Sequence, residues 1–227
     1  MTQPPSPGPP PQPNPAPGPG PRGPHPPQPV VAGLLLAAGG GRRLGGRAKA
    51  LLPYRGRPLV EHAVRVLRAG GCGPVHVVTG AAADRVAAEA DLAGCTVVVN
   101  PEWASGMGSS LRAGLASLQA PGPEHTTPDA ALVLLVDQPG IGAAAVARVR
   151  EAYTSRDSLV TAAYDGRRGH PGLFGADRWA DIAASATGDR GARDHLAAHA
   201  AAIRLVECGD IATDHDIDTP DDLRHLR

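Results

Sequence analysis

The sequence predicts an α/β protein with a mostly parallel central sheet. Apolar runs of strand length alternate with segments of helical periodicity along the chain, which is the pattern of βαβ units. The run 130–136 is continuously apolar, as in strands that are covered on both faces. Gly39 and Asp137 each follow such a run, at the strand ends where open α/β sheets bind their ligands.

The individual elements follow from local patterns. Pro58 opens a helix that Gly70 and Gly71 end, because proline suits a first helical turn and glycine a helix end. Near the C-terminus, Thr219 is expected to cap a last helix, with Asp222 three residues later in a near capping box. Strands are expected at 30–36, 75–79, 96–99, 130–136, 159–163, 172–174 and 203–206, and helices at 58–69, 84–90, 108–118, 143–153, 176–184, 192–200 and from 219 onward.

The chain divides into a tail and one domain. Residues 1–29 contain fifteen of the 25 prolines and no Leu, Ile, Val, Phe or Trp. Such a segment buries too little apolar surface to offset the entropy of ordering it, so we expect a disordered, partly polyproline II tail. Residues 30–227 have the length of a single domain.

Composition narrows the class of protein. Lys and Arg total 22, as do Asp and Glu, so no basic field attracts nucleic acid. The tail lacks the apolar core of a signal peptide, and no apolar run approaches the ~20 residues of a membrane span. We therefore expect a cytoplasmic protein with no membrane partner. Three cysteines without metal-type spacing make a disulfide scaffold or zinc site unexpected.

The most informative segment is 36–49, L-A-A-G-G-G-R-R-L-G-G-R-A-K. Its glycines expose backbone N–H groups, and its cations surround them, as in phosphate-binding loops. Leu44 occupies the position of a required glycine in a dinucleotide fingerprint, and Gly46-Arg47 replaces the Lys-Ser/Thr of a P-loop. The pattern that remains is L-A-A-G-x-G-x-R-x-G-x-x-x-K, with an ordinary glycine-rich turn as the alternative.

Other segments carry candidate functional groups. Asp137 follows a buried strand and is expected to bind Mg²⁺, which takes one or two carboxylates plus substrate phosphates. The acidic run 214–222 offers a second carboxylate, although such runs often only cap a helix. The segment 100–114 joins a glycine-rich loop to a helix start, where hydroxyls and amides either read a base or ribose or simply cap the helix.

Two arginine-bearing loops, 167–171 and 188–193, suit a phosphorylated acceptor, since a guanidinium binds phosphate in bidentate fashion. Each loop alone is equally a solvated basic turn. His170 is either a donor to phosphate or a structural histidine. The sequence contains no G-x-S-x-G motif, so a nucleophilic triad is not indicated.

The segment 36–49 closely resembles the signature loop of nucleotidyltransferases that activate sugar phosphates, methylerythritol phosphate and the molybdenum cofactor. Four further segments resemble the molybdenum cofactor cytidylyltransferases of the MobA-like NTP transferase family: N-P-E-W-A-S-G-M-G-S-S-L-R-A-G, R-R-G-H-P, G-D-R-G-A-R and D-T-P-D-D-L. The resemblance covers about 31–226. Leu44, Val136 and Gly140 depart from the usual pattern, and Gly140 is expected to loosen the loop behind Asp137.

This resemblance implies a Rossmann-like, three-layer α/β/α nucleotidyltransferase fold of the GT-A-like type. It implies Mg²⁺-dependent transfer of CMP from CTP to the phosphate of the molybdenum cofactor (molybdopterin), with release of pyrophosphate; Ala38 favours CTP. The resemblance implies catalytic roles for Arg43, Lys49 and Asp137, and binding of Mg²⁺ by Asp137 and Asp218. Binding of nucleotide and pterin falls to Leu36, Ala37, Ala38, Gly39, Gly41, Asn100, Gly108, Ser109, Ser110, Arg112, Arg168, His170, Asp189 and Arg193.

Two alternatives stay open at this point. The acceptor of the nucleotidyl group is a sugar phosphate or another phosphorylated compound in the first. In the second, the chain is a non-catalytic chaperone that binds nucleotide or pterin and delivers cofactor to a molybdoenzyme. Intact Asp137, Asp218 and Lys49 favour an enzyme, because a pure binder has little use for a metal at the α-phosphate.

Overall fold

The computed structural model describes residues 28–120 and 127–226. The tail predicted at 1–29 therefore lies almost wholly outside the described residues. The described chain contains a seven-stranded sheet of order β5-β4-β1-β6-β8-β7-β9 and a small hairpin of β2 and β3. The strands span Val31–Leu36 (β1), Pro53–Tyr54 (β2), Arg57–Pro58 (β3), Val75–Thr79 (β4), Thr96–Val99 (β5), Ala130–Leu135 (β6), Leu159–Tyr164 (β7), Arg167–Gly175 (β8) and Ile203–Glu207 (β9).

The sheet is mostly parallel, as predicted. The pairs β1–β4, β1–β6, β4–β5 and β7–β9 are parallel, and only β8 runs antiparallel to its neighbours β6 and β7. The short extended piece predicted at 172–174 is the end of this longer strand. Its first residues, from Arg167 to His170, are polar and not fully buried, so they carry no apolar signal.

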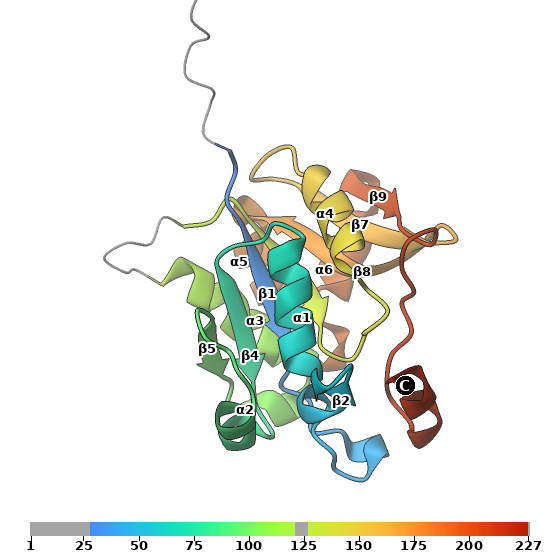
Figure 1. Cartoon of the computed structure of the whole chain (residues 1–227). Coiled ribbons are helices and arrows are strands. Elements are labelled where there is room, and N and C mark those ends of the chain that lie inside the picture. Colours follow the sequence, from blue (N-terminus) through green and yellow to red (C-terminus); the bar gives the residue numbers. More distant parts are fainter. Residues whose placement is uncertain (1–27, 121–126, 227) are drawn as a thin grey trace, which may run out of the picture.

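Helices cover both faces and give the predicted three layers (Figure 1). Helices α1 (Leu59–Ala69), α2 (Ala83–Glu89) and α4 (Ala143–Glu151) contribute to the core on one face. Helices α3 (Met107–Gln119), α5 (Trp179–Ser185) and α6 (Arg193–Ala198) pack on the other. No described helix is long and apolar enough to cross a membrane.

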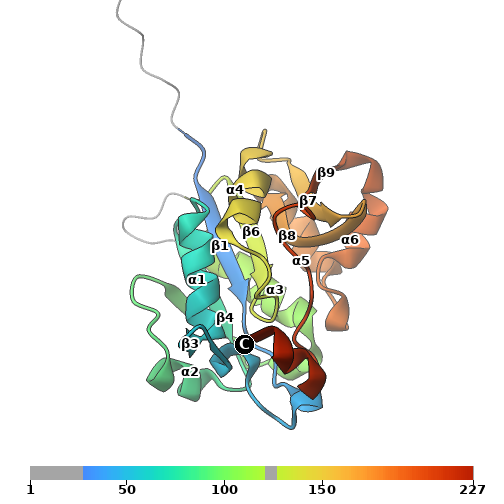
Figure 2. The ribbon, with the colours of Figure 1, turned by 45° about the vertical axis from the view of Figure 1, so that its right-hand side comes forward.

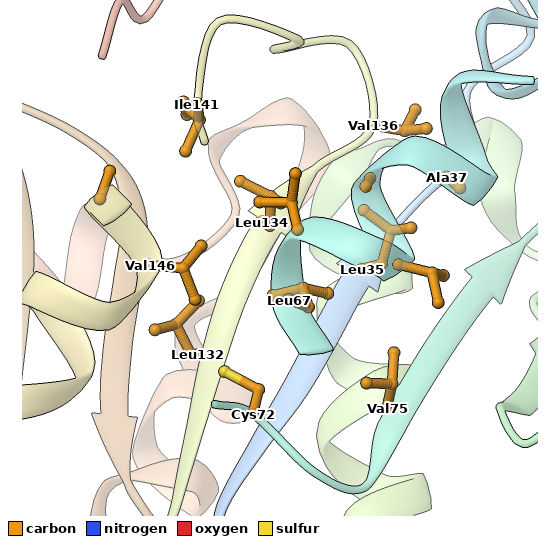
Figure 3. Close-up of a cluster of buried hydrophobic side chains, with 14 of the residues drawn as sticks. Leu35, Ala37, Leu67, Cys72, Val75, Leu132, Leu134, Val136, Ile141 and Val146 are labelled. Carbon is orange, nitrogen blue, oxygen red and sulfur yellow. The ribbon is translucent and has the colours of Figure 1, made fainter. Parts of the chain in front are cut away.

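The larger core lies between the sheet and α1 and α4. Figure 3 shows Leu67 of α1 and Val146 of α4 gathered with Leu35 of β1 and Leu134 of β6. On the opposite face, α3 approaches the sheet closely because it carries Gly114: a Cβ there would lie 2.5 Å from Cδ1 of Leu34. Two buried layers thus hold β1 and β6 rigidly, and the candidate site lies where these two strands end.

The structure departs from the predicted elements at several points. The expected last helix is a seven-residue 3-10 turn, Pro220–Leu226. Only half of the expected capping box forms. The Asp222 carboxylate accepts from the backbone N–H of Thr219 at 2.7 Å, as in a capping box, but the Thr219 hydroxyl donates to Asp222 instead of accepting from its backbone N–H. The β2–β3 hairpin was not predicted, because its strands have two residues each; its turn uses Arg55 and Gly56, both with positive φ.

Candidate active site

The glycine-rich segment forms a compact turn at the carboxyl end of β1. The backbone N–H of Ala37 donates to Val78 O at 2.8 Å, which ties the loop to β4. Gly41 has φ +60°, and a Cβ there would lie 1.8 Å from Arg47 O, so no other residue fits this position without rebuilding the turn. The 3-10 turn Arg42–Leu44 follows, with Leu44 buried and both arginines exposed.

This turn forms one wall of a cleft of about 610 Å³, which we call the glycine-loop cleft. Its lining combines small residues, apolar residues, cations and carboxylates: Leu36, Ala38, Gly39, Gly40, Gly41, Arg42, Arg43, Lys49, Trp103, Gly106, Met107, Ser110, Leu135, Val136, Asp137, Asp189, Asp216 and Asp218. A Cβ on Gly39 would meet no atom within 4 Å. The absence of a side chain there leaves the backbone open to the cleft.

Asp137 and Asp218 are 81 positions apart in sequence but lie side by side. Asp137 follows β6 at the carboxyl edge of the sheet. The C-terminal segment returns to this edge, as Figure 2 shows, and the N–H of Ile217 donates to Asp137 O at 2.8 Å. Since the Ile217 side chain is fully buried, this anchor fixes Asp218 beside Asp137.

Gly140 strengthens this anchor, contrary to the expectation that it loosens the loop behind Asp137. A Cβ on Gly140 would lie 2.1 Å from Oγ1 of Thr213 and 2.7 Å from its carbonyl oxygen. The N–H of Thr213 donates to Gly140 O at 3.3 Å. The missing side chain therefore lets the C-terminal segment pack directly on the loop that carries Asp137.

Lys49 joins the two carboxylates. Its Nζ donates to Oδ2 of Asp137 at 2.7 Å and also to Oδ1 of Asp218, while Arg43 contacts Asp218 at 3.2 Å. Burial by itself would lower the pKa of the Lys49 ammonium, but the charge and hydrogen bond of Asp137, together with Asp218, outweigh burial and raise this pKa above its usual value. The lysine is therefore fully charged at neutral pH.

The same two carboxylates fit a hard divalent cation. Both point at one position, now occupied by the Lys49 ammonium, and carboxylate oxygens are the ligands that Mg²⁺ prefers. Within residues 28–120 and 127–226, no group of three or more His, Cys, Asp or Glu side chains forms a complete metal site. A metal ion here would thus complete its coordination with ligand phosphates and water, as Mg²⁺ commonly does.

Asn100 organises the loop before α3. This buried residue donates from Nδ2 to the hydroxyls of Ser109 and Ser110 at 2.9 and 3.0 Å, and accepts from the N–H of Glu102 at 2.9 Å. Ser109 also donates to Glu102 O at 2.9 Å. Of these predicted binding residues, Ser110 alone lines the cleft, and Asn100 and Ser109 hold the loop in shape.

Three further predicted residues lie away from the cleft lining. The Arg112 guanidinium donates to the backbone oxygen of Ala186. Gly108 packs against the same segment, since a Cβ there would lie 2.8 Å from the carbonyl carbon of Ala186. Ala37 is buried in the core. Their positions indicate that they shape the walls of the site without facing its interior.

A second pocket of about 410 Å³ adjoins the first, and we call it the arginine pocket. The two share Leu36, Met107, Leu135, Asp189 and Asp216. The arginine pocket brings together four predicted residues from distant loops: Arg168, His170, Asp189 and Arg193. Burial lowers the pKa of His170 and outweighs the opposing charge of Asp137, while the Arg193 charge acts in the same direction as burial, so the neutral imidazole is favoured.

Sequence reasoning missed several residues of the two pockets. Trp103 lines the glycine-loop cleft, and Gln138 lines the arginine pocket, where its Nε2 donates to Oδ1 of Asp216 at 2.8 Å. Trp103 lies in the quoted N-P-E-W segment and Gln138 beside Asp137, so both were near the motifs. Neither their spacing nor their chemistry alone indicates which way they face.

Sequence comparison with known proteins identifies one family. The MobA-like NTP transferase domain family matches residues 33–203. Nicotine blue oxidoreductase from Paenarthrobacter nicotinovorans is 42% identical over 208 residues, which cover 87% of this chain and 97% of that protein. The sequence match thus joins a nucleotidyltransferase family to a relative that carries the name of an oxidoreductase.

Solved structures share the fold. Rv0371c from Mycobacterium tuberculosis H37Rv has a TM-score of 0.71 and 28% identity, with 87% of this chain and 96% of that chain covered. The structure of Rv0371c in complex with manganese has a TM-score of 0.68 and 27% identity, with 87% of this chain and 97% of that chain covered. A nucleotidyl transferase from Methanothermobacter (Mth528) has a TM-score of 0.72 and 23% identity, with 87% of this chain and 96% of that chain covered. At this identity the similarity supports the fold alone.

Proposed function

The chain belongs to the MobA-like NTP transferase family of nucleotidyltransferase enzymes, and on that premise we propose that it transfers CMP from CTP to the phosphate of the molybdenum cofactor, releasing pyrophosphate. One observation carries the proposal: Lys49, Asp137 and Asp218 converge in a cleft walled by a glycine-rich turn, next to a pocket bordered by arginines. Triphosphate and phosphorylated acceptor would then occupy adjoining spaces.

In this reaction an oxygen of the acceptor phosphate attacks the α-phosphorus of CTP. A new P–O bond forms, the bond from the α-phosphorus to the bridging oxygen breaks, and pyrophosphate leaves with that electron pair. A phosphate monoester is already anionic at pH 7, so no side chain needs to remove a proton from it. Catalysis then depends on positioning and on neutralising charge.

The residues divide this work. Asp137 and Asp218 would hold Mg²⁺, which neutralises phosphate charge when bound. With the carboxylates so engaged, the Lys49 ammonium is free to pair with the departing pyrophosphate, and the exposed Arg43 reaches the same group. Backbone N–H groups of the glycine turn orient the phosphates. On the acceptor side, Arg168 and Arg193 bind the acceptor phosphate, and the neutral His170 donates or accepts one hydrogen bond.

A second candidate function is that of an oxidoreductase, favoured by the 42% identity with nicotine blue oxidoreductase. The arginine pocket contains Val133, Leu111 and Phe174, which suit an aromatic ring. Against a nicotinamide dinucleotide stands Leu44, which occupies the place of a glycine in the dinucleotide fingerprint. The carboxylate pair around Lys49 also has no evident role in hydride transfer.

One experiment separates the candidates. The protein is incubated with Mg²⁺, each nucleoside triphosphate in turn and either the molybdenum cofactor or a sugar phosphate, and pyrophosphate release and product mass are measured. Oxidation of NADH and NADPH is followed in parallel reactions. We expect pyrophosphate with CTP and a pterin product heavier by one CMP. Transfer only to sugar phosphates would reassign the acceptor, and CTP binding without pyrophosphate release would indicate a chaperone. Oxidation of NADH or NADPH in the presence of nicotine blue, and no nucleotidyl transfer, would favour the oxidoreductase.

A further inference from the structure

The geometry points to Trp103 as the platform on which the base of the bound nucleotide stacks. This inference rests on the proposed function in one respect, because it requires a nucleoside triphosphate in the glycine-loop cleft. Of the described residues that line this cleft, Trp103 is the only aromatic one. Nucleobases stack on aromatic side chains whatever their sequence, so a single indole in a phosphate-binding cleft is the natural contact for the base.

Two glycines from different loops make room for the indole. A Cβ on Gly40 would lie 3.1 Å from Cζ3 of Trp103, and a Cβ on Gly80 would lie 2.5 Å from its Cβ. Gly40 belongs to the glycine-rich turn after β1, and Gly80 follows β4. The indole thus rests directly on the backbone of the phosphate-binding turn, beside the place where the nucleoside must extend from its phosphates.

The loop that carries Trp103 is held rigidly before any ligand binds. Trp103 begins a 3-10 turn, Trp103–Ser105, that lies between Asn100 and α3. The hydrogen bonds of buried Asn100 to Ser109, Ser110 and Glu102 close this loop from both ends. A preorganised ring loses little conformational entropy when a base stacks on it, so the buried network has a direct use at the site.

The other tryptophan shows how a purely structural indole behaves in this protein. Trp179 is 1% exposed, and its Nε1 donates to Phe174 O at 2.8 Å, as buried tryptophans usually require. Trp103 is only half-buried, and within the described part of the chain its indole N–H makes no hydrogen bond. Its ring is therefore placed for contact at the cleft wall rather than for filling the core.

The test compares two substitutions of similar volume, W103F and W103L. Both preserve apolar packing on Gly40 and Gly80, but only phenylalanine keeps an aromatic face. Titration calorimetry with Mg²⁺ measures the affinity for CTP, for ATP and for inorganic tripolyphosphate, which lacks a base. We expect W103L to lower the affinity for CTP and ATP about tenfold or more. W103F should retain most of the affinity for both nucleotides, and neither substitution should change the affinity for tripolyphosphate.

Intrinsic fluorescence gives a second readout, because Trp103 and Trp179 are the two tryptophans of the chain. CTP should quench the wild-type protein and leave the W103F variant, which keeps only the buried Trp179, unchanged. Equal CTP affinity in the wild type and W103L, with tripolyphosphate bound equally, would overturn the role of Trp103 while leaving the proposed function intact. Failure of the wild type to bind any triphosphate would instead remove the proposed function.

Discussion

Two cations of the glycine-loop cleft, Lys49 and Arg43, differ from two cations of the arginine pocket, Arg168 and Arg193, in whether their charge is already paired. Lys49 and Arg43 are already paired with Asp137 and Asp218. Arg168 and Arg193 are exposed, and within residues 28–120 and 127–226 neither guanidinium makes an ion pair or a hydrogen bond. To bind phosphate, Lys49 and Arg43 would therefore have to exchange partners, whereas Arg168 and Arg193 could bind an anion without breaking an existing side-chain contact.

This difference indicates that charged side chains have different roles in the two regions. On the proposed function, a lysine held between two carboxylates keeps those carboxylates together until a divalent ion takes its place, so the cleft would be assembled before substrate arrives. Unpaired arginines at the edge of a partly apolar pocket contribute attraction for an anionic group but do not organise the fold. Substitutions in the first region should affect turnover, and those in the second should affect acceptor affinity.

The largest effect is expected for Lys49→Ala. Loss of the ammonium removes charge stabilisation of the departing pyrophosphate, and the rate of pyrophosphate release should fall about 100-fold or more. It also leaves Asp137 and Asp218 facing each other without a counter-ion, so the melting temperature in EDTA should fall and Mn²⁺ should restore it. Arg47→Ala, at an exposed position of the same loop, is the matched control. A near-normal rate for Lys49→Ala would contradict the role assigned to this residue.

Asp218→Asn should have the next largest effect. The amide keeps the shape of the side chain but binds a divalent ion poorly, and we expect turnover to fall about 10- to 100-fold with a higher Mg²⁺ requirement. Activity is measured across a Mg²⁺ titration. Asp221→Asn, an exposed neighbour, should behave as wild type. If the activity of both variants depended on Mg²⁺ concentration in the same way, the role of Asp218 in binding the metal would be contradicted.

Arg168→Ala should separate the two regions. Removing a charge-assisted contact to the acceptor phosphate should raise the KM for the phosphorylated acceptor about tenfold, with CTP affinity and the Mg²⁺ requirement unchanged. Arg167→Ala is the control, because Arg167 is exposed and lies outside the lining of both pockets. A change in CTP affinity without a change in acceptor KM would show that the division between the pockets is drawn wrongly.

The smallest effect on chemistry, though not on stability, is expected for Gly140→Ala. The added methyl would lie 2.1 Å from Oγ1 of Thr213, so the C-terminal segment must shift, at a cost of about 1–3 kcal/mol in the free energy of unfolding. Urea denaturation measures this cost. Gly142→Ala, where a Cβ meets no atom within 4 Å, should cost less, because it changes only the N-cap residue of α4. If the two variants were equally stable, close packing at Gly140 would not hold the C-terminal segment against the loop that carries Asp137.

Much of the fold could be predicted because its signals are local. Apolar runs and glycine stops located every parallel strand to within about two residues, and the expected three-layer α/β/α nucleotidyltransferase fold is confirmed. What failed depended on distant neighbours. The polar start of β8 is a strand only because β7 pairs with it, and Gly140 is a close-packing residue only because Thr213 returns to meet it.

The candidate site divides in the same way. The glycines and cations of the contiguous segment 36–49 predicted a phosphate-binding turn. The structure forms a turn directly after β1 that lines the glycine-loop cleft, and its binding of phosphate stays a prediction. The resemblance of D-T-P-D-D-L had assigned Asp218 to the same site as Asp137. The ion pairs of both carboxylates with Lys49 were not predicted, because they depend on how buried Ile217 anchors the C-terminal segment at the sheet edge. Trp103 was overlooked for the same reason, since its position depends on glycines in two other loops.

The central claim is that a nucleoside triphosphate and a divalent ion meet between Asp137 and Asp218. A crystal structure with Mn²⁺ and a non-hydrolysable CTP analogue tests it most directly, through the anomalous signal of the metal. We predict a peak between these two carboxylates, triphosphate oxygens at the metal and at the glycine turn, and Lys49 moved from the carboxylates onto phosphate. A nucleotide bound elsewhere, with Lys49 still joining both carboxylates, would contradict the account.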